Sequence, residues 1–587
     1  MPPALESPAL AAWLNPPAPS QPPYWVQALI GPNLAYYLRL APADRTLFYA
    51  FAESMPEYFA LDNNDEGFAP IPLAQRDAVR SMFSYLEQLI DLQFQESTNL
   101  IQQRTLALMT NRQQRSDGYA WSPGFSLKAY DVFLDNDPPI NFAVGQFDAL
   151  TLIHEVSHAL GLRHAFEGSQ AFDSGGSDPA LSGNEESTIW TVMSYTSYKD
   201  QFRAELRPFD IAALQWLYGP SKSQRMGDDR YTLLSTEANF IWDAGGFDTL
   251  DASGLDAVKR DFYGSPVGAA SDLRLVLDLR VGTKSHIDID FDRISLPGQI
   301  TINAGTTIEA VIGTPSRDWI YGNEVGNLIE ARGGDDLLAG REGDDRLFGG
   351  EGADSLAGGA GDDLLDGGPG IDWAFFDGPR AGFALQVQSP SHYALSRRSL
   401  SQAEVDQLND IERLQFSDGT VVLAVDPHGQ ISLRMIGLLA GPAVLKLGSS
   451  SGLSVSAASG GGTGAGDGTG ALPVTYLATL LGFAMQALDQ GMSASALASL
   501  AIRSVFGEQA NTRDLIARVY QHWWEMDLVD QPPEAGFIDR LEHIATQAQF
   551  TPSSLLLWAC ELPQSDQMIK LSGIDETGLG VIWPGAT

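Results

Sequence analysis

Residues 340–375 read GREGDDRLFGGEGADSLAGGAGDDLLDGGPGIDWAF, in which a pattern of nine residues recurs. Each copy opens with glycine and carries aspartate at its sixth position, and most copies place leucine at the eighth, as at Leu347, Leu356 and Leu365. Such a unit predicts a tight turn followed by a short strand whose leucine fills a shared interior. Successive copies therefore predict a column of stacked parallel strands. A disordered Gly/Asp linker is the alternative, and the maintained leucine register argues against it.

The aspartates recur at the same place in each predicted turn. Their carboxylates, together with backbone carbonyl oxygens, would offer the all-oxygen environment that Ca²⁺ prefers. Without ions these carboxylates would repel one another, so we expect calcium binding and folding to be coupled. Weaker copies extend the pattern back to Gly313, and an isolated copy lies at residues 243–250. The predicted calcium ligands are Asp248, Asp318, Asp336, Asp345, Asp354, Asp363 and Asp372.

A second informative stretch, residues 154–164, reads HEVSHALGLRH. On a helix, His154 and His158 would lie one turn apart on the same face and could bind one metal ion. Gly161 can end that helix in a left-handed conformation, which would turn the chain so that His164 supplies a third nitrogen. Three histidine ligands leave a fourth position open, as in catalytic zinc sites, and Glu155 would lie beside it. A chance arrangement is the alternative, although the chain has only 8 histidines in 587 residues.

The pattern HExxHxxGxxH resembles that of the metzincin zinc endopeptidases. Downstream, Met193 and Tyr195 resemble the Met-containing turn of that family, with a core methionine and a surface tyrosine as the plain alternative. Residues 118–124 and 206–218 resemble segments of the serralysin branch, and the resemblance covers about residues 24–425. Serralysins usually have proline and glycine where this chain has Ala165 and Ser157.

The resemblance implies peptide-bond hydrolysis at a zinc ion held by His154, His158, His164 and Tyr195. Glu155 would accept a proton from the attacking water, and Tyr195 would then donate a hydrogen bond to the oxyanion. Met193 would form the floor of the site. The implied partners are protein or peptide substrates and a proteinaceous inhibitor.

The nonapeptides resemble the RTX repeat, which forms a parallel β-roll with bound calcium. Such proteins typically leave bacteria through a type I exporter that reads an uncleaved carboxy-terminal signal, so the resemblance implies an extracellular protein. The chain begins MPPALE and its first basic residue is Arg39, so no cleaved amino-terminal signal is expected. No apolar stretch reaches the ~20 residues of a membrane span, and none is expected.

The composition narrows the class of protein. Asp and Glu number 74 against 36 Lys and Arg, a net charge of −38, which argues against nucleic-acid binding because phosphates are held by basic side chains. The acidity favours cation binding instead. The single cysteine, Cys560, excludes an intramolecular disulfide and a cysteine-rich zinc site.

Composition and periodicity predict a multidomain chain. Helices are expected over residues 76–94 and 147–160, and strands over residues 105–109 and 130–134. Beyond residue 219, turns and short strands dominate, and helical periodicity returns after a Gly/Ser-rich stretch. The predicted units are a flexible tail or propeptide (1–24), an α+β metzincin catalytic domain (25–219), a β-roll domain (220–447, core repeats 313–375), a linker (448–471) and a helical carboxy-terminal domain (472–587).

These patterns favour a secreted zinc endopeptidase that is folded and stabilised by calcium. The alternative is a calcium-dependent surface adhesion or binding protein whose protease domain is vestigial or self-processing. The presence of Glu155 together with all three histidines favours the enzyme.

Overall fold

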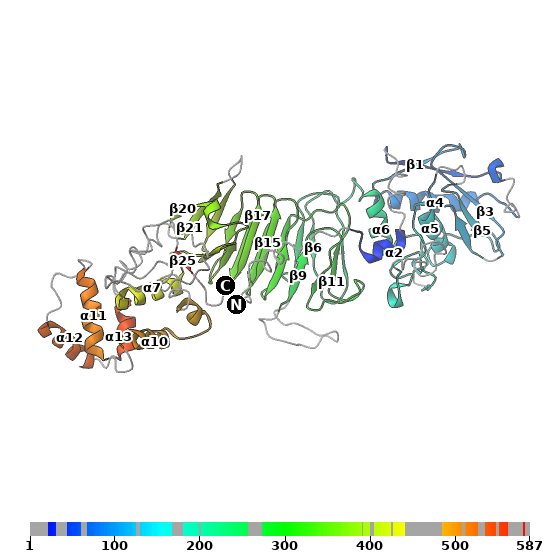
Figure 1. Ribbon diagram of the computed structural model, residues 1–587. Helices are drawn as coiled ribbons and strands as arrows, with labels where there is room; N and C mark the ends of the chain where they lie inside the picture. The colour runs from blue at the N-terminus through cyan, green and yellow to red at the C-terminus, as the bar shows by residue number, and fades with distance from the viewer. Residues whose placement is uncertain are drawn as a thin grey trace, which may run out of the picture.

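The computed structural model describes residues 21–30, 44–59, 67–114, 116–124, 129–166, 180–198, 201–255, 273–389, 391–398, 404–423, 426–440, 484–506, 511–525, 535–547, 551–560 and 579–581. They form three packed regions in a row (Figure 1): an α/β region, a long stack of strands, and a group of helices. The predicted mixed α/β architecture with parallel sheets is confirmed. The predicted linker over 448–471 lies outside the described residues, as does the predicted tail up to residue 20.

The α/β region has one sheet, with helices packed against it. The strand order is β2-β1-β3-β5-β4, and all neighbours are parallel except β4, which pairs with β5 in the antiparallel sense. Its elements are α2 (Tyr24–Ile30), β1 (Thr46–Phe51), η1 (Glu57–Phe59), α4 (Leu73–Leu86), β2 (Gln93–Glu96), β3 (Thr105–Asn111), β4 (Gly118–Ala120), β5 (Val132–Asp135), α5 (Phe147–Ala159), η3 (Gly183–Glu185) and α6 (Pro208–Tyr218).

The helix predicted over residues 76–94 is only partly correct. Helix α4 ends at Leu86, although Ile90 and Leu92 continue the apolar pattern and are fully buried. The chain turns because the Glu87 carboxylate accepts a hydrogen bond from the Phe94 backbone N–H at 2.6 Å, at the start of β2. Contacts with other segments, rather than helical periodicity, therefore bury residues 89–92. The predicted helix over 147–160 and the strand over 105–109 are confirmed as α5 and β3.

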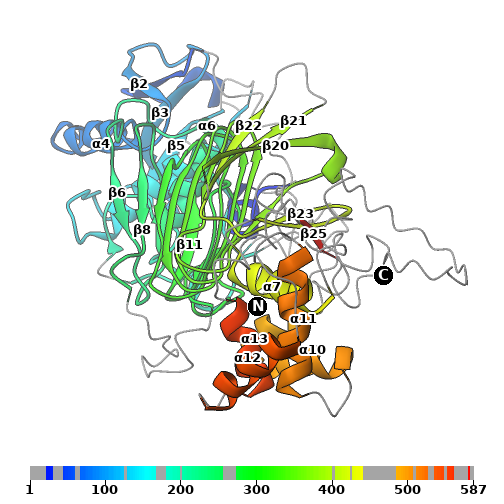
Figure 2. The same cartoon turned by 90° about the vertical axis from the view of Figure 1, so that its left-hand side faces the viewer.

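The stack of strands forms two sheets that share one interior, seen along the stack in Figure 2. The sheet orders are β25-β24-β23-β19-β17-β15-β13-β9-β10-β11-β7 and β20-β21-β22-β18-β16-β14-β12-β8-β6. Its strands are β6 (Arg230–Thr232), β7 (Asn239–Ile241), β8 (Thr249–Asp251), β9 (Leu275–Asp278), β10 (Ser285–Ile287), β11 (Gln299–Ile302), β12 (Ala310–Ile312), β13 (Asp318–Tyr321), β14 (Leu328–Gly333), β15 (Leu337–Glu342), β16 (Arg346–Glu351), β17 (Ser355–Ala360), β18 (Leu364–Asp366), β19 (Trp373–Phe375), β20 (Phe383–Ser389), β21 (His392–Arg397), β22 (Val405–Asn409), β23 (Arg413–Phe416) and β24 (Gly419–Val422).

Successive nonapeptides alternate between the two sheets, so each strand pairs in parallel with the strand two repeats later. Leu338 thus lies beside Leu356, and Leu347 lies beside Leu365. All four leucines are fully buried, as the sequence pattern predicts. Each of these repeats contributes one such leucine to the shared interior, which makes this core thin.

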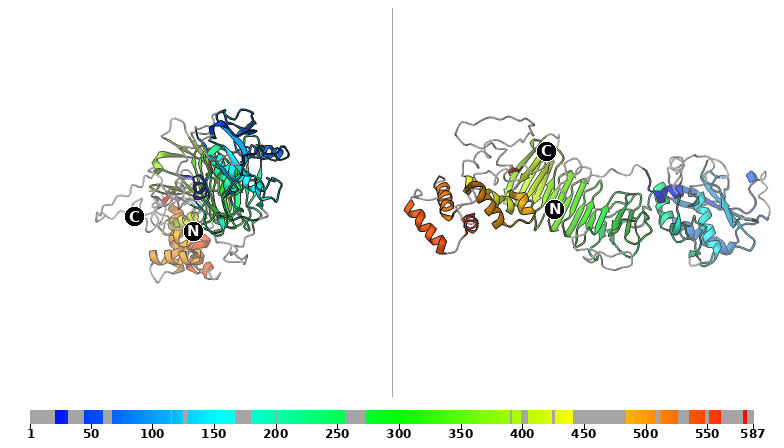
Figure 3. Two further views of the ribbon diagram at one scale, coloured as in Figure 1. Left: turned by 90° about the vertical axis from the view of Figure 1, so that its right-hand side faces the viewer. Right: turned by 60° about the horizontal axis from the view of Figure 1, so that its bottom comes forward.

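The remaining helices pack on one another beyond the end of the roll (Figure 3). They are α7 (Pro427–Ala440), α10 (Ala494–Phe506), α11 (Thr512–Glu525), α12 (Ala535–Gln547) and α13 (Pro552–Cys560). Helix α7 falls within the range assigned to the β-roll from sequence, yet it contacts α10, α11 and α13. The short strand β25 (Leu579–Val581) pairs with β24 of the roll, which the helical periodicity did not predict. Among the described residues, no helix is both long enough and apolar enough to cross a membrane.

Candidate metal centres

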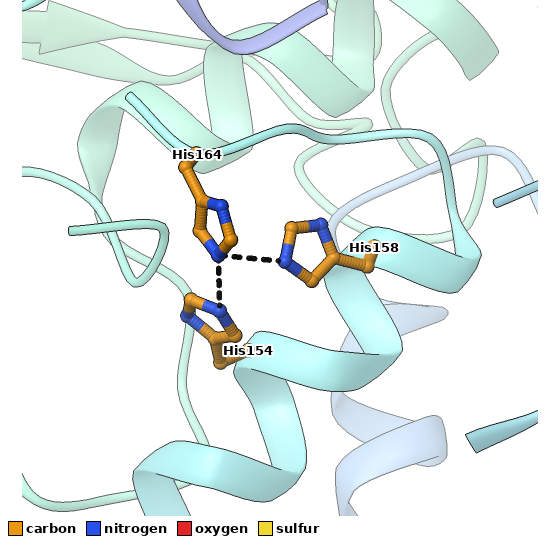
Figure 4. Close-up of side chains that lie close together, drawn as sticks. All are labelled: His154, His158 and His164. Atoms are coloured by element: carbon orange, nitrogen blue, oxygen red, sulfur yellow. Dashed lines mark hydrogen bonds between the residues drawn. The ribbon is translucent and has the colours of Figure 1, made fainter. Parts of the chain in front are cut away.

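Helix α5 and the turn after it bring three imidazoles together (Figure 4). His154 and His158 lie on one face of α5, and Gly161 adopts a φ of 109°, where a side chain would be strained, so the chain turns and brings His164 back. The Nε2 atom of His164 lies 3.3 Å from Nε2 of His154 and 3.1 Å from Nε2 of His158. The predicted juxtaposition of these three rings is therefore present.

Backbone carbonyl groups orient two of the three rings. Nδ1 of His154 lies 2.6 Å from the Val192 carbonyl oxygen, and Nδ1 of His158 lies 2.8 Å from that of Leu162. Because a carbonyl oxygen only accepts, each Nδ1 carries the proton and each Nε2 directs its lone pair toward the centre of the cluster. Burial, reinforced by the charges of His154 and His164, lowers the pKa of His158 to about 3 and keeps that ring in the neutral form that ligates metals.

The geometry of the cluster fits a zinc ion. Converging lone pairs repel unless a cation lies between them, and Zn–N bonds of about 2.0–2.1 Å in a tetrahedron separate the nitrogens by about 3.3 Å. The two Nε2 separations of 3.1 and 3.3 Å agree with that value. These three histidines could therefore hold a zinc ion.

Glu155 follows His154 on α5 and is 5% exposed. Burial raises the pKa of its carboxyl to about 8, with a smaller contribution from the charge of Asp117. Its Oε2 atom is buried without a hydrogen-bond partner. Gly118 on β4 packs against this side chain so closely that a Cβ there would lie 2.7 Å from Cγ of Glu155. The carboxylate is thus held in a dry position by close packing, and the role of Gly118 was not evident from the sequence.

Of the residues predicted to form the Met-containing turn, one is buried and the other reaches the histidines. Met193 is fully buried in the core of the α/β region. The Tyr195 hydroxyl lies 2.9 Å from Nε2 of His164, while 67% of this tyrosine is exposed. Tyr195 therefore reaches the histidine cluster from the solvent side, and its ring packs against those of His164 and Phe166, with centroids 4.7 and 4.9 Å away.

Asp210 on α6 holds the turn in place and was not identified from the sequence. Its carboxylate accepts hydrogen bonds from the Thr191 hydroxyl at 2.6 Å and from the Val192 and Arg207 backbone N–H groups at 2.8 and 2.9 Å. Because the carbonyl of Val192 contacts His154, Asp210 positions that ring indirectly. An aspartate at the start of a helix is an ordinary capping residue, so no local signal marked it.

The repeat aspartates form two ladders along the roll. The backbone N–H of Asp336 donates to Oδ1 of Asp354 at 2.8 Å, and that of Asp354 donates to Oδ1 of Asp372 at 2.7 Å. In the other ladder, Asp345 donates to Asp363 in the same way at 2.9 Å. The Oδ2 atoms of all five aspartates are buried without a hydrogen-bond partner, as is that of Asp248.

Burial makes these carboxylates poor acids in the absence of ions. It raises the pKa of Asp363 to about 6, of Asp318 and Asp354 to about 7, and of Asp345 and Asp372 to about 8. Burial together with the charges of Asp318 and Asp354 raises the pKa of Asp336 to about 10. Bound cations would remove this penalty, so the ladders could hold Ca²⁺.

The isolated copy that contains Asp248 lies in a second carboxylate group, with Asp229 and Asp243. The Asp229 backbone N–H donates to Asp248 Oδ1 at 2.8 Å, and the Asp248 N–H donates to the Glu309 carboxylate at 2.8 Å. Asp248 therefore stands in the same type of ladder as the repeat aspartates. Asp229 and Glu309 were not found from the sequence, because they lie outside every copy of the nonapeptide, and Asp243 opens the isolated copy but was not among the predicted ligands.

Known proteins resemble parts of this chain. The RTX calcium-binding nonapeptide repeat family (4 copies) matches residues 312–347 and 340–374. Serralysin of Proteus mirabilis is 31% identical over 210 residues, which are 32% of this chain and 38% of that protein. Serralysin G of Dickeya chrysanthemi is 28% identical over 317 residues, and serralysin of Photorhabdus laumondii is 25% identical over 322 residues; each match covers 48% of this chain and 60% of the relative.

The chain thus spans less than two thirds of the length of each of these curated relatives. The similarity to several serralysins and the repeat match point to the same group of proteins. The chain is therefore a serralysin homologue that carries RTX calcium-binding repeats.

Proposed function

We propose that this protein is a secreted zinc-dependent endopeptidase, folded and stabilised by calcium, that hydrolyses peptide bonds of extracellular proteins. The observation that carries the proposal is the convergence of three Nε2 atoms, together with the buried carboxylate of Glu155 on the helix that carries His154 and His158. The similarity to proteins named serralysin supports it. Residues 25–219 would form the catalytic domain, and export would use type I secretion machinery.

His154, His158 and His164 would hold the zinc ion, with Tyr195 as a further ligand. The zinc, when bound, would supply a Lewis acid that polarises the peptide carbonyl and acidifies water. Glu155, whose pKa is raised by burial, would accept a proton from the attacking water and return it to the leaving amine. The Tyr195 hydroxyl would then donate a hydrogen bond to the developing oxyanion.

The decisive experiment compares Glu155→Gln with a matched control, Glu57→Gln, an exposed residue of the same region. Both variants of the full chain are loaded with zinc and calcium and assayed on casein. Glu155→Gln should retain its zinc and lose about 10²- to 10⁴-fold in rate, because the proton acceptor is removed. The control should match the wild type. A zinc-loaded Glu155→Gln variant that cleaves casein at the control rate would refute the assigned role.

A further inference from the structure

The roll continues beyond the last nonapeptide. The repeat match ends at residue 374, after which the chain leaves for the hairpin of β20 and β21. It then returns as β22, which pairs with β18, and as β23, which pairs with β19. Both pairings are parallel, as they are within the repeats. Residues 405–416 thus form one more turn of the roll without the sequence of a repeat.

In that turn, Glu412 occupies the position of a repeat aspartate. The Asp372 backbone N–H donates to Oε2 of Glu412 at 2.7 Å, just as the Asp354 N–H donates to Oδ1 of Asp372 at 2.7 Å. Leu408 pairs with Leu365 and Arg413 pairs with Trp373, so four residues (409–412) stand here where the repeat has seven (366–372). The longer side chain of glutamate spans the distance that an aspartate on a longer turn would span.

The backbone packs around a glycine in this last turn in the same way as it does between turns of the repeats. At Gly313, in the first repeats, the N–H donates to the Glu330 carbonyl, and a Cβ would lie 2.7 Å from the carbonyl oxygen of Ala331 and 2.8 Å from Oδ2 of Asp318. Gly367 is arranged likewise. Its N–H donates to the Asn409 carbonyl, and a Cβ would lie 2.5 Å from the carbonyl oxygen of Asp410 and 2.6 Å from Oδ2 of Asp372. A glycine therefore keeps open the same small space between carboxylate and carbonyl.

We propose that Asp372, Glu412 and the carbonyl oxygen of Asp410 form a further calcium site at the end of the roll, outside the repeats. Oδ2 of Asp372 is buried without a hydrogen-bond partner, and Asp372 itself is fully buried. Water would complete the six to eight oxygens that Ca²⁺ takes. The inference rests on calcium binding by the repeats, which is part of the proposed function.

The basic residue next to the site is engaged elsewhere. Arg413 donates to Asp426 at 2.6 Å and to Asp489 of the helical region at 2.7 and 3.0 Å. Its guanidinium is thus directed toward the helical region, and the charges of Asp372 and Glu412 are left for a cation. An ion at this site would fix the segment that carries Arg413, and so the contact between the roll and the helical region.

The test uses Glu412→Gln in the full chain, with Glu351→Gln, an exposed residue of β16, as the matched control. Glutamine still accepts the Asp372 N–H through its carbonyl oxygen, so the fold of the turn is retained while one charged ligand is lost. Native mass spectrometry and a calcium titration count the bound ions. Glu412→Gln should bind one ion fewer, or bind one ion about tenfold more weakly, whereas the control should match the wild type.

Equal ion counts and equal affinities for Glu412→Gln and the control would overturn the proposal while leaving calcium binding by the repeats intact. A wild-type chain that binds no calcium would overturn both. A crystal structure of the calcium-loaded wild-type chain gives a check that is independent of any variant. Density for an ion between Asp372 and Glu412 supports the site, and its absence beside occupied repeat turns contradicts it.

Discussion

The α/β region and the β-roll present their candidate metal ligands in different ways. In the α/β region, the rings of His154 and His158 are oriented by backbone carbonyls and rest on a thick core. In the roll, buried aspartates are stacked above one another over an interior to which each of these repeats contributes one leucine. In the first arrangement, hydrogen bonds to backbone carbonyls and the surrounding core hold two of the rings in place independently of an ion. The second concentrates like charges, so its folding should depend on the ion.

The largest expected effect is the loss of the roll when calcium is withdrawn. Chelation should remove most of the strand signal in circular dichroism of the full chain, because unpaired carboxylates and ordered glycines oppose folding. Calcium should restore the signal cooperatively, and magnesium much less, since its small octahedral shell fits poorly.

A double variant tests whether the calcium dependence of folding arises from the aspartate ladders. Asp354→Asn combined with Asp363→Asn should shift the calcium midpoint to higher concentration, whereas the exposed control Asp418→Asn should not. A chelated chain with the spectrum of the calcium-loaded one would show that the roll does not need its ions.

The next effect concerns the exposed side of the histidine cluster. Tyr195→Phe should lower the rate of casein cleavage by about 10²-fold, because one oxyanion donor is commonly worth ~10²–10³ in rate. Zinc content should stay at one ion per chain, since the three imidazoles are untouched. Tyr198→Phe, a nearby exposed tyrosine, serves as the control. Loss of zinc from Tyr195→Phe would make Tyr195 a structural ligand instead.

A smaller effect is expected from pH on the calcium-free roll. Burial raises the pKa of Asp354 to about 7 and of Asp345 and Asp372 to about 8, against about 4 in an unfolded chain. The folded state therefore binds more protons than the unfolded state between pH 4 and 8, and the free energy of unfolding falls as the pH rises through that window.

In the presence of a chelator, the strand signal should accordingly be stronger at pH 5 than at pH 8. With saturating calcium, this gain on acidification should disappear, because the ions already compensate the carboxylates. An equal signal at both pH values without calcium would show that the aspartates do not control folding.

In both regions, the sequence predicts the features that depend on local spacing and misses the contacts between distant residues. The nonapeptides and the HEVSHALGLRH segment are local patterns, so the roll interior and the three imidazoles followed from spacing alone. Contacts between residues that are far apart in the sequence gave no such local signal. Asp210 lies 56 residues after His154, and Glu412 lies 40 residues after Asp372.

Local signals also mislead where tertiary contacts replace them. The apolar pattern over residues 76–94 suggested one helix, yet the Glu87 carboxylate caps the start of β2 and the chain turns there. Helix α7 likewise falls within the range 220–447 assigned to the β-roll, although its contacts are with later helices. Periodicity reports which residues are buried, but not against which partner.

The smallest expected effect tests the central contrast most directly. The zinc affinity of the full chain should be measured by competition with a chromogenic chelator, once in millimolar calcium and once in calcium-free buffer. The three histidines, their carbonyl partners and Tyr195 all belong to the α/β region, so the two dissociation constants should agree within a few-fold. His158→Ala should lose the zinc in both buffers. Loss of zinc binding by the wild-type chain on removal of calcium would contradict a histidine site that forms independently of the roll.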